Sequence, residues 1–136
     1  MTTNFPGAVP EIPVNNLTAA LGYYRDHFGF HKDWGGDDGG IGQVSRGSCR
    51  LFLTNQSFRM HNPNAASGPM VIWINLNSKN EVDELYQEWN GRGARIFYEP
   101  ESKPWNLHEF AALDLDGNML RVFYDFAWEL PDRDGR

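Results

Sequence analysis

The strand-forming run Leu107–Leu113 contains one histidine and one glutamate, residue types that often take part in acid–base chemistry. Because neighbouring residues of a strand point to opposite faces, His108 and Glu109 cannot act as a pair on one substrate. Glu109 shares its face with apolar residues, so its carboxylate must be solvated, paired or protonated. We favour a structural role, or a pair with an arginine, over a role as general base.

The other nucleophilic and titratable residues do not predict a catalytic site. His27 and His31 flank Gly29, where a helix is predicted to end, so they do not share a helical face. His61 lies in a polar segment, and we expect all three histidines at the surface. Cys49 lies in a predicted strand, and the sequence identifies no histidine partner for it. We therefore assign no catalytic residue.

Two short motifs have simple structural interpretations. Segment 114–118, DLDGN, has the residue types of a calcium-binding loop, but its glycine is at the fourth position, where such a loop needs it at the sixth. A tight turn between strands over Leu107–Leu113 and Met119–Tyr124 explains the segment better and predicts a β-hairpin. Gly40 and Gly42 lack the third glycine and the following helix of a dinucleotide-binding loop.

The hydrophobic pattern predicts an α+β protein in which one module occurs twice. Each copy has the order strand, helix and three strands (βαβββ), which is visible when Gly29 is aligned with Gly93. Ser78 and Glu81 form a capping box at the start of the second helix. Strands are predicted over residues 8–14, 30–34, 41–46, 49–54, 70–76, 95–99, 107–113 and 119–124. The single domain 1–136 thus divides into a first module, a linker, a second module and an acidic tail, at residues 8–54, 55–69, 70–124 and 125–136.

The composition limits the classes of function. A chain of 136 residues is typical of one domain, and no apolar run approaches the roughly 20 residues that span a bilayer, so we expect no membrane association. The formal net charge of −6 argues against nucleic acid as a partner and mildly favours a cationic or neutral ligand. One cysteine and no recognisable leader predict a cytoplasmic protein. Aromatic residues make up 14% of the chain, enough to line a pocket as well as the core.

Three stretches carry a resemblance to a known family: AVPEIPVNNLTAALGYYRDHFGF, VDELYQEWNGRG and KPWNLHEFAALDLDGNMLRVF. With the repeated βαβββ order, they resemble the glyoxalase, bleomycin-resistance and extradiol-dioxygenase superfamily, also called vicinal oxygen chelate proteins. The AVP start, the LFLT strand, the DELYQEW helix and the PW…EFAALD…GN hairpin are most similar to the bleomycin-resistance branch. The resemblance implies curved mixed sheets that enclose a cleft, in a homodimer.

Enzymes of this superfamily hold a divalent metal with His and Glu side chains on the first and last strands of each module. The corresponding positions here are Val9, Phe52, Val71 and Arg121, and none of these side chains is a usual ligand. Among the neighbouring residues on the same strand faces, only Glu11 has a side chain that commonly binds a metal. We therefore expect a protein with no metal and no cofactor, and we favour a binding protein over an enzyme.

The resemblance to the bleomycin-resistance branch implies that a small molecule is bound and sequestered without chemistry. Aromatic and acidic side chains would suit a ligand that is flat at one end and cationic at the other, such as a bleomycin-type antibiotic. The predicted ligand-binding residues are Trp34, Asp37, Asp38, Trp73, Trp105, Glu109 and Phe110. Two alternatives stay open: a metal-dependent lyase or dioxygenase that uses Glu11, His108 and Glu109, and a non-catalytic regulatory or interaction module.

Overall fold

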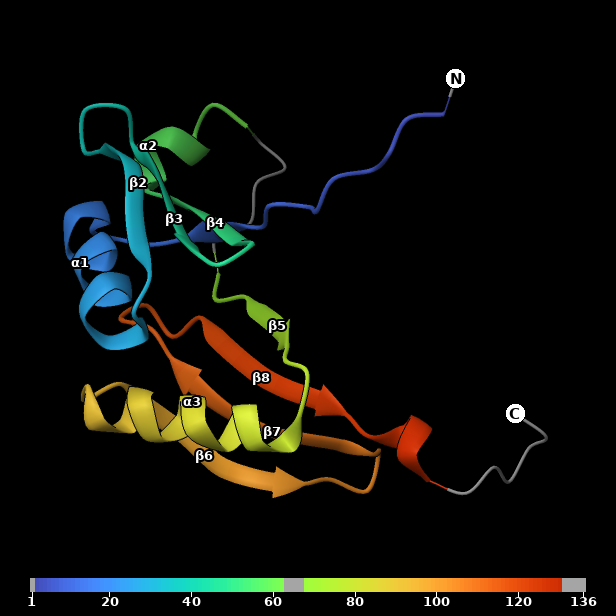
Figure 1. Ribbon diagram of the computed structural model, residues 1–136. Helices are drawn as coiled ribbons and strands as arrows, with labels where there is room; N and C mark the ends of the chain where they lie inside the picture. The colour runs from blue at the N-terminus through green and yellow to red at the C-terminus, as the bar shows by residue number, and fades with distance from the viewer. Residues whose placement is uncertain (1, 63–67, 131–136) are drawn as a thin grey trace. The chain divides into compact units, whose positions relative to one another are not determined.

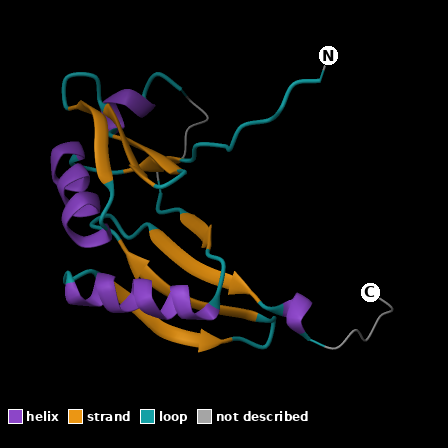
Figure 2. Ribbon diagram, in the orientation of Figure 1, coloured by secondary structure: helices purple, strands orange, loops and turns teal. Residues whose placement is uncertain are grey.

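A computed structural model describes residues 2–62 and 68–130. The chain divides into two compact units between Gly68 and Pro69. Each unit contains one four-stranded sheet and one long helix that packs against it (Figures 1 and 2). Among the helices of the described residues, none is long and apolar enough to cross a membrane.

The first unit has the order strand, helix and three strands. Its elements are β1 (Glu11–Pro13), α1 (Leu17–Phe28), β2 (His31–Gly36), β3 (Ile41–Arg46) and β4 (Cys49–Thr54). The sheet order is β1-β4-β3-β2, with β1 parallel to β4 and the other pairs antiparallel. The Asn16 side chain caps α1 by accepting a hydrogen bond from the Ala19 amide at 3.0 Å. Gly29 ends the helix in the left-handed conformation, with φ of 71°.

The second unit repeats this order. Its elements are β5 (Val71–Asn75), α3 (Lys79–Gly91), β6 (Arg95–Ser102), β7 (Leu107–Leu113) and β8 (Met119–Asp125). The sheet order β5-β8-β7-β6 is the same as in the first unit, and β5 is parallel to β8. Asp114 closes the β7–β8 turn, since its carboxylate accepts from the amides of Asp116 and Asn118 at 2.8 and 2.9 Å. The predicted fold class, an α+β fold of two tandem βαβββ modules, is confirmed.

Several element boundaries differ from the predicted ones. β1 is shorter than residues 8–14: it begins after Pro10, which has no N–H to donate to a ladder, and it ends at Pro13. β2 continues to Gly36, into residues predicted as a loop. The predicted linker contains a short helix, α2 (Gln56–Arg59), capped by the side chain of Asn55. Residues 63–67 of the linker and 131–136 of the tail lie outside the described residues.

The sheet of the second unit has one apolar and one mixed face. The apolar face lies under α3, and its side chains Phe110, Leu120 and Val122 are fully buried. On β7 and β8 the alternate residues, Glu109 and Arg121 among them, point to the opposite face, as the period of two in a strand requires. The helix therefore packs on one face of the sheet, and polar and aromatic side chains lie on the opposite face.

The capping box of α3 gives a first prediction. The Ser78 hydroxyl accepts from the Glu81 amide at 3.1 Å, and the Glu81 carboxylate accepts from the Asn77 amide at 2.8 Å. We expect Ser78→Ala to lower the free energy of unfolding by about 1 kcal/mol, because a helical amide loses its acceptor. Urea unfolding measures the change, with Ser48→Ala in the exposed β3–β4 turn as the control. An equal effect of the two variants would contradict the capping role.

Candidate functional site

A fully buried carboxylate, Glu109 on β7, lies at the centre of the mixed face of the second module. One of its oxygens, Oε1, accepts hydrogen bonds from the Tyr98 hydroxyl and from Nη2 and, at 3.1 Å, Nε of Arg121. The other oxygen, Oε2, accepts from the Trp105 indole Nε1 at 3.0 Å. The prediction that Glu109 pairs with an arginine is confirmed, and Arg121 on β8 is that arginine.

The hydrogen bonds of Glu109 determine the charge states of Glu109 and of the Tyr98 hydroxyl. Burial favours the neutral form of Glu109, but the donors Tyr98, Arg121 and Trp105 and the positive charge of Arg121 outweigh it and lower the pKa of the carboxyl. Burial, followed by the bond to Glu109, raises the pKa of the Tyr98 hydroxyl to about 12. At neutral pH, Glu109 is therefore an anion that already accepts four hydrogen bonds from three residues. Such a group is poorly suited to accept a proton from a substrate.

Aromatic rings surround this ion pair. The guanidinium carbon of Arg121 lies 4.0 Å from the centroid of the Trp73 ring, a cation–π contact. Trp73 meets Phe123 edge to face at 5.5 Å. Trp73 and Trp105 are large apolar side chains that stay 46% and 55% exposed. We call the group the aromatic face; it comprises Trp73, Tyr98, Trp105, Glu109, Arg121 and Phe123.

The lowered pKa of Glu109 makes a prediction for acid pH. A carboxyl whose folded pKa lies below its unfolded value of about 4.3 contributes stability above that pH and loses it as the pH falls through the folded value. We expect the stability advantage of the parent protein over Glu109→Gln to be constant near neutral pH and to shrink below about pH 4.3. Urea unfolding at a series of pH values measures this advantage. A difference that does not depend on pH would contradict the assignment of an ionised Glu109.

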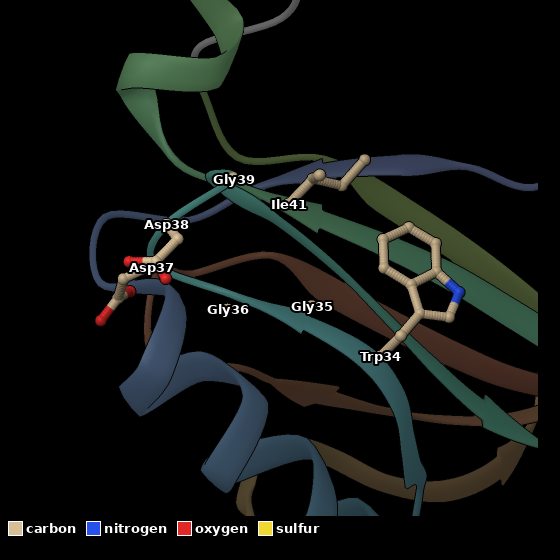
Figure 3. Close-up of a pocket in the computed structure, with 7 residues that line it drawn as sticks. All are labelled: Trp34, Gly35, Gly36, Asp37, Asp38, Gly39 and Ile41. Atoms are coloured by element: carbon tan, nitrogen blue, oxygen red, sulfur yellow. The ribbon is translucent and has the colours of Figure 1, made fainter.

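Three of the predicted ligand-binding residues, Trp34, Asp37 and Asp38, lie in the first module. They line an open pocket of about 630 Å³ together with Gly35, Gly36, Gly39 and Ile41. Figure 3 shows the two carboxylates at the turn after β2, pointing away from the Trp34 indole. Asp37 accepts a hydrogen bond from the Thr18 hydroxyl at 2.6 Å, and the indole packs near Phe52 at 5.6 Å. Aromatic and acidic groups of this pocket therefore do not converge on one point.

Phe110 was predicted to contact the ligand, and its position in the structure contradicts this prediction. Its side chain is fully buried, and its ring packs edge to face against Tyr86 at 5.6 Å and Trp89 at 5.5 Å on α3. It therefore lies on the helix side of the sheet, opposite its sequence neighbour Glu109. Trp73, Trp105 and Glu109 are brought together on the aromatic face, whereas Phe110 belongs to the core.

His108 forms a separate hydrogen-bonded chain. Its Nδ1 lies 2.9 Å from the Ser102 hydroxyl and its Nε2 lies 2.8 Å from the Asp83 carboxylate. The order Ser–His–Asp is that of a hydrolase triad, but the carboxylate is half-exposed on α3 and does not provide the buried orientation that the triad needs. The chain instead joins β6, β7 and α3. Because its partners differ from those of Glu109, the prediction that the two residues do not act as a pair is confirmed.

The side chains at the four implied metal positions do not fit a divalent ion. Val9, Phe52 and Val71 have no ligand atoms, and Arg121 is a cation whose pKa is raised by Glu109 in spite of burial. Of the alternative ligands, Glu11 accepts from the Thr54 hydroxyl at 3.2 Å, and Glu109 accepts hydrogen bonds from three residues. Within residues 2–62 and 68–130, no three His, Cys, Asp or Glu side chains come together as a metal site.

Comparisons with known proteins agree with this topology. A family model described as "Glyoxalase/Bleomycin resistance protein/Dioxygenase superfamily" matches residues 8–122. No curated protein matches the chain. A glyoxalase/bleomycin resistance protein/dioxygenase from Nocardioides is a similar solved structure, with a TM-score of 0.74, 18% identity and coverage of 98% of this chain and 93% of that chain.

Two further solved structures have the same fold. Lactoylglutathione lyase from Agrobacterium tumefaciens has a TM-score of 0.69 and 22% identity, with coverage of 92% of this chain and 98% of that chain. TioX from Micromonospora sp. ML1 has a TM-score of 0.67 and 17% identity, with coverage of 88% and 98%. At these identities the structures show the fold alone. The match of the family model over most of the sequence shows that the chain belongs to the glyoxalase/bleomycin resistance protein/dioxygenase superfamily.

Proposed function

We propose that this protein binds and sequesters a small, flat aromatic molecule without converting it, and that it does so as a homodimer. A bleomycin-type antibiotic is the candidate ligand, and the membership of a superfamily that includes bleomycin resistance proteins supports it. The observation that supports binding without chemistry is the Glu109–Arg121 pair. The carboxylate of the aromatic face is bonded to its own protein, and a guanidinium occupies the position of the last implied metal ligand.

The exposure of the two tryptophans supports a binding role. The burial of a large apolar side chain lowers the free energy. A ligand that covers the exposed half of an indole on this sheet face would therefore bind favourably. Trp105 is held in place by its hydrogen bond to Glu109, and Trp73 by its contacts with Arg121 and Phe123. A ligand ring therefore meets rings that are already oriented, which reduces the entropy lost on binding.

Calorimetric titration with a bleomycin-type drug tests the proposal. We expect saturable binding to the parent protein and an affinity about 5-fold weaker in Trp73→Leu, since one stacking contact contributes about 1 kcal/mol. The matched control is Trp128→Leu, which removes an exposed indole that contacts Tyr124 instead of the aromatic face. Absence of binding to the parent would remove the drug as ligand. Equal losses in the two variants would contradict binding at the aromatic face.

A further inference from the structure

Arg121 has hydrogen-bond donors that the protein does not use. Its Nε and Nη2 donate to Glu109, and the Tyr98 hydroxyl is a further hydrogen-bond partner of the guanidinium. The side chain is 24% exposed, so part of it is in contact with solvent. A guanidinium has five N–H groups in a fixed plane, and those that Glu109 and Tyr98 do not use are available to a ligand.

The position of these donors is fixed from two sides. Glu109 holds one edge of the guanidinium, and the Trp73 ring lies under the guanidinium carbon at 4.0 Å. Trp73 is itself packed edge to face against Phe123. A flat molecule that stacks on the exposed part of the indole would thus have its rim next to preoriented donors.

Charge on this face is uneven. The negative charge of Glu109 is fully buried, whereas its cationic partner is partly exposed. A second cation, the Lys103 ammonium, lies 4.5 Å from the Tyr98 ring centroid and 5.9 Å from that of Trp105. Its partner Glu101, at 3.0 Å, is the more exposed member of that pair. A ligand that reaches the aromatic face therefore meets the N–H donors of Arg121 and, next to the two rings, a lysine whose charge is paired with Glu101.

From this arrangement we infer that the aromatic face selects a planar aromatic ligand with a hydrogen-bond acceptor on its rim, a carboxylate above all or a ring carbonyl, which Arg121 binds through the donors that Glu109 leaves free. This inference rests on the proposed function and deepens it. For a bleomycin-type drug, the inference places the flat end on the aromatic face and the cationic end away from Arg121, because two cations in contact repel each other.

Matched naphthalenes test the inference on the parent protein, without any variant that endangers folding. Quenching of tryptophan fluorescence compares 2-naphthoate, methyl 2-naphthoate, 2-methylnaphthalene and the 2-naphthylmethylammonium ion. We expect 2-naphthoate to bind at least about 10-fold more tightly than the ammonium compound, with the ester between them, because a charge-assisted hydrogen bond replaces a like-charge contact. Equal affinities, or tighter binding of the ammonium compound, would overturn the inference and leave the proposed function standing. Failure of all four to bind would also overturn the inference, whereas the proposed function is decided separately by the titration with the bleomycin-type drug.

A second arm uses Lys103→Met, which leaves the Glu109–Arg121 pair intact. We expect its affinity for 2-naphthoate to fall about 3-fold, as for a partly exposed charge contact, with no change for 2-methylnaphthalene. The control Lys32→Met removes an exposed lysine of the first module. An equal fall in affinity for both naphthalenes would mean lost packing instead of lost charge, and would count against the inferred selectivity.

Discussion

The Arg121→Leu variant is expected to lose about 3 kcal/mol of unfolding free energy at neutral pH, toward the low end for a broken buried ion pair because the guanidinium is partly exposed. The loss arises because Glu109 stays buried and ionisable without its cation. Chemical denaturation followed by circular dichroism measures it.

The matched comparison is the double variant Glu109→Leu, Arg121→Leu. Removal of both charges leaves no unpaired group on β7 and β8, so we expect the double variant to be more stable than Arg121→Leu alone. The loss in Arg121→Leu should also shrink in acid, where Glu109 takes up a proton and no longer needs a cation. A single variant as stable as the parent protein would mean that Glu109 is not held by Arg121.

The second large effect concerns Phe110. We expect Phe110→Ala to lower the free energy of unfolding by about 4 kcal/mol, because it opens a cavity between Tyr86 and Trp89 of α3 and the sheet. The control Phe97→Ala removes an exposed ring of β6 and should change stability by no more than about 0.5 kcal/mol.

Phe110→Leu separates packing from ligand contact. This milder variant keeps the core filled with an apolar side chain, so it should fold and bind the ligand with the affinity of the parent protein. If the affinity fell while the stability stayed unchanged, Phe110 would be a ligand contact after all, and its assignment to the core would be wrong.

The repeated fold was predictable because local signals agree with the tertiary structure. The Asn16 cap and Gly29 stop delimit α1, the Ser78–Glu81 box begins α3, and Asp114 forms the β7–β8 turn. The short helix α2 was missed because Gln56–Arg59 makes only one turn and shows no period. The capping side chain of Asn55 was the only available sign of it.

The candidate site was predictable in part. An ionisable residue among apolar neighbours on β7 required a partner, but the sequence did not say which arginine, because the partner is set by the β7–β8 register. Tyr98 was missed because the β6–β7 register shifts on both sides of it, which breaks the simple alternation. Phe110 was an avoidable error. The alternation that separates His108 from Glu109 also places Phe110 on the face opposite Glu109.

Native mass spectrometry tests the central claim, that the aromatic face binds an intact molecule without a metal. The protein is treated with a chelator and mixed with excess 2-naphthoate or a bleomycin-type drug, so that one spectrum reports ligand mass, metal content and assembly together. We predict a complex whose added mass is that of the unchanged ligand, with no mass for a metal, and a smaller fraction of complex in Trp73→Leu. A complex that forms only after a divalent metal is restored, or a ligand recovered with an altered mass, would contradict the account.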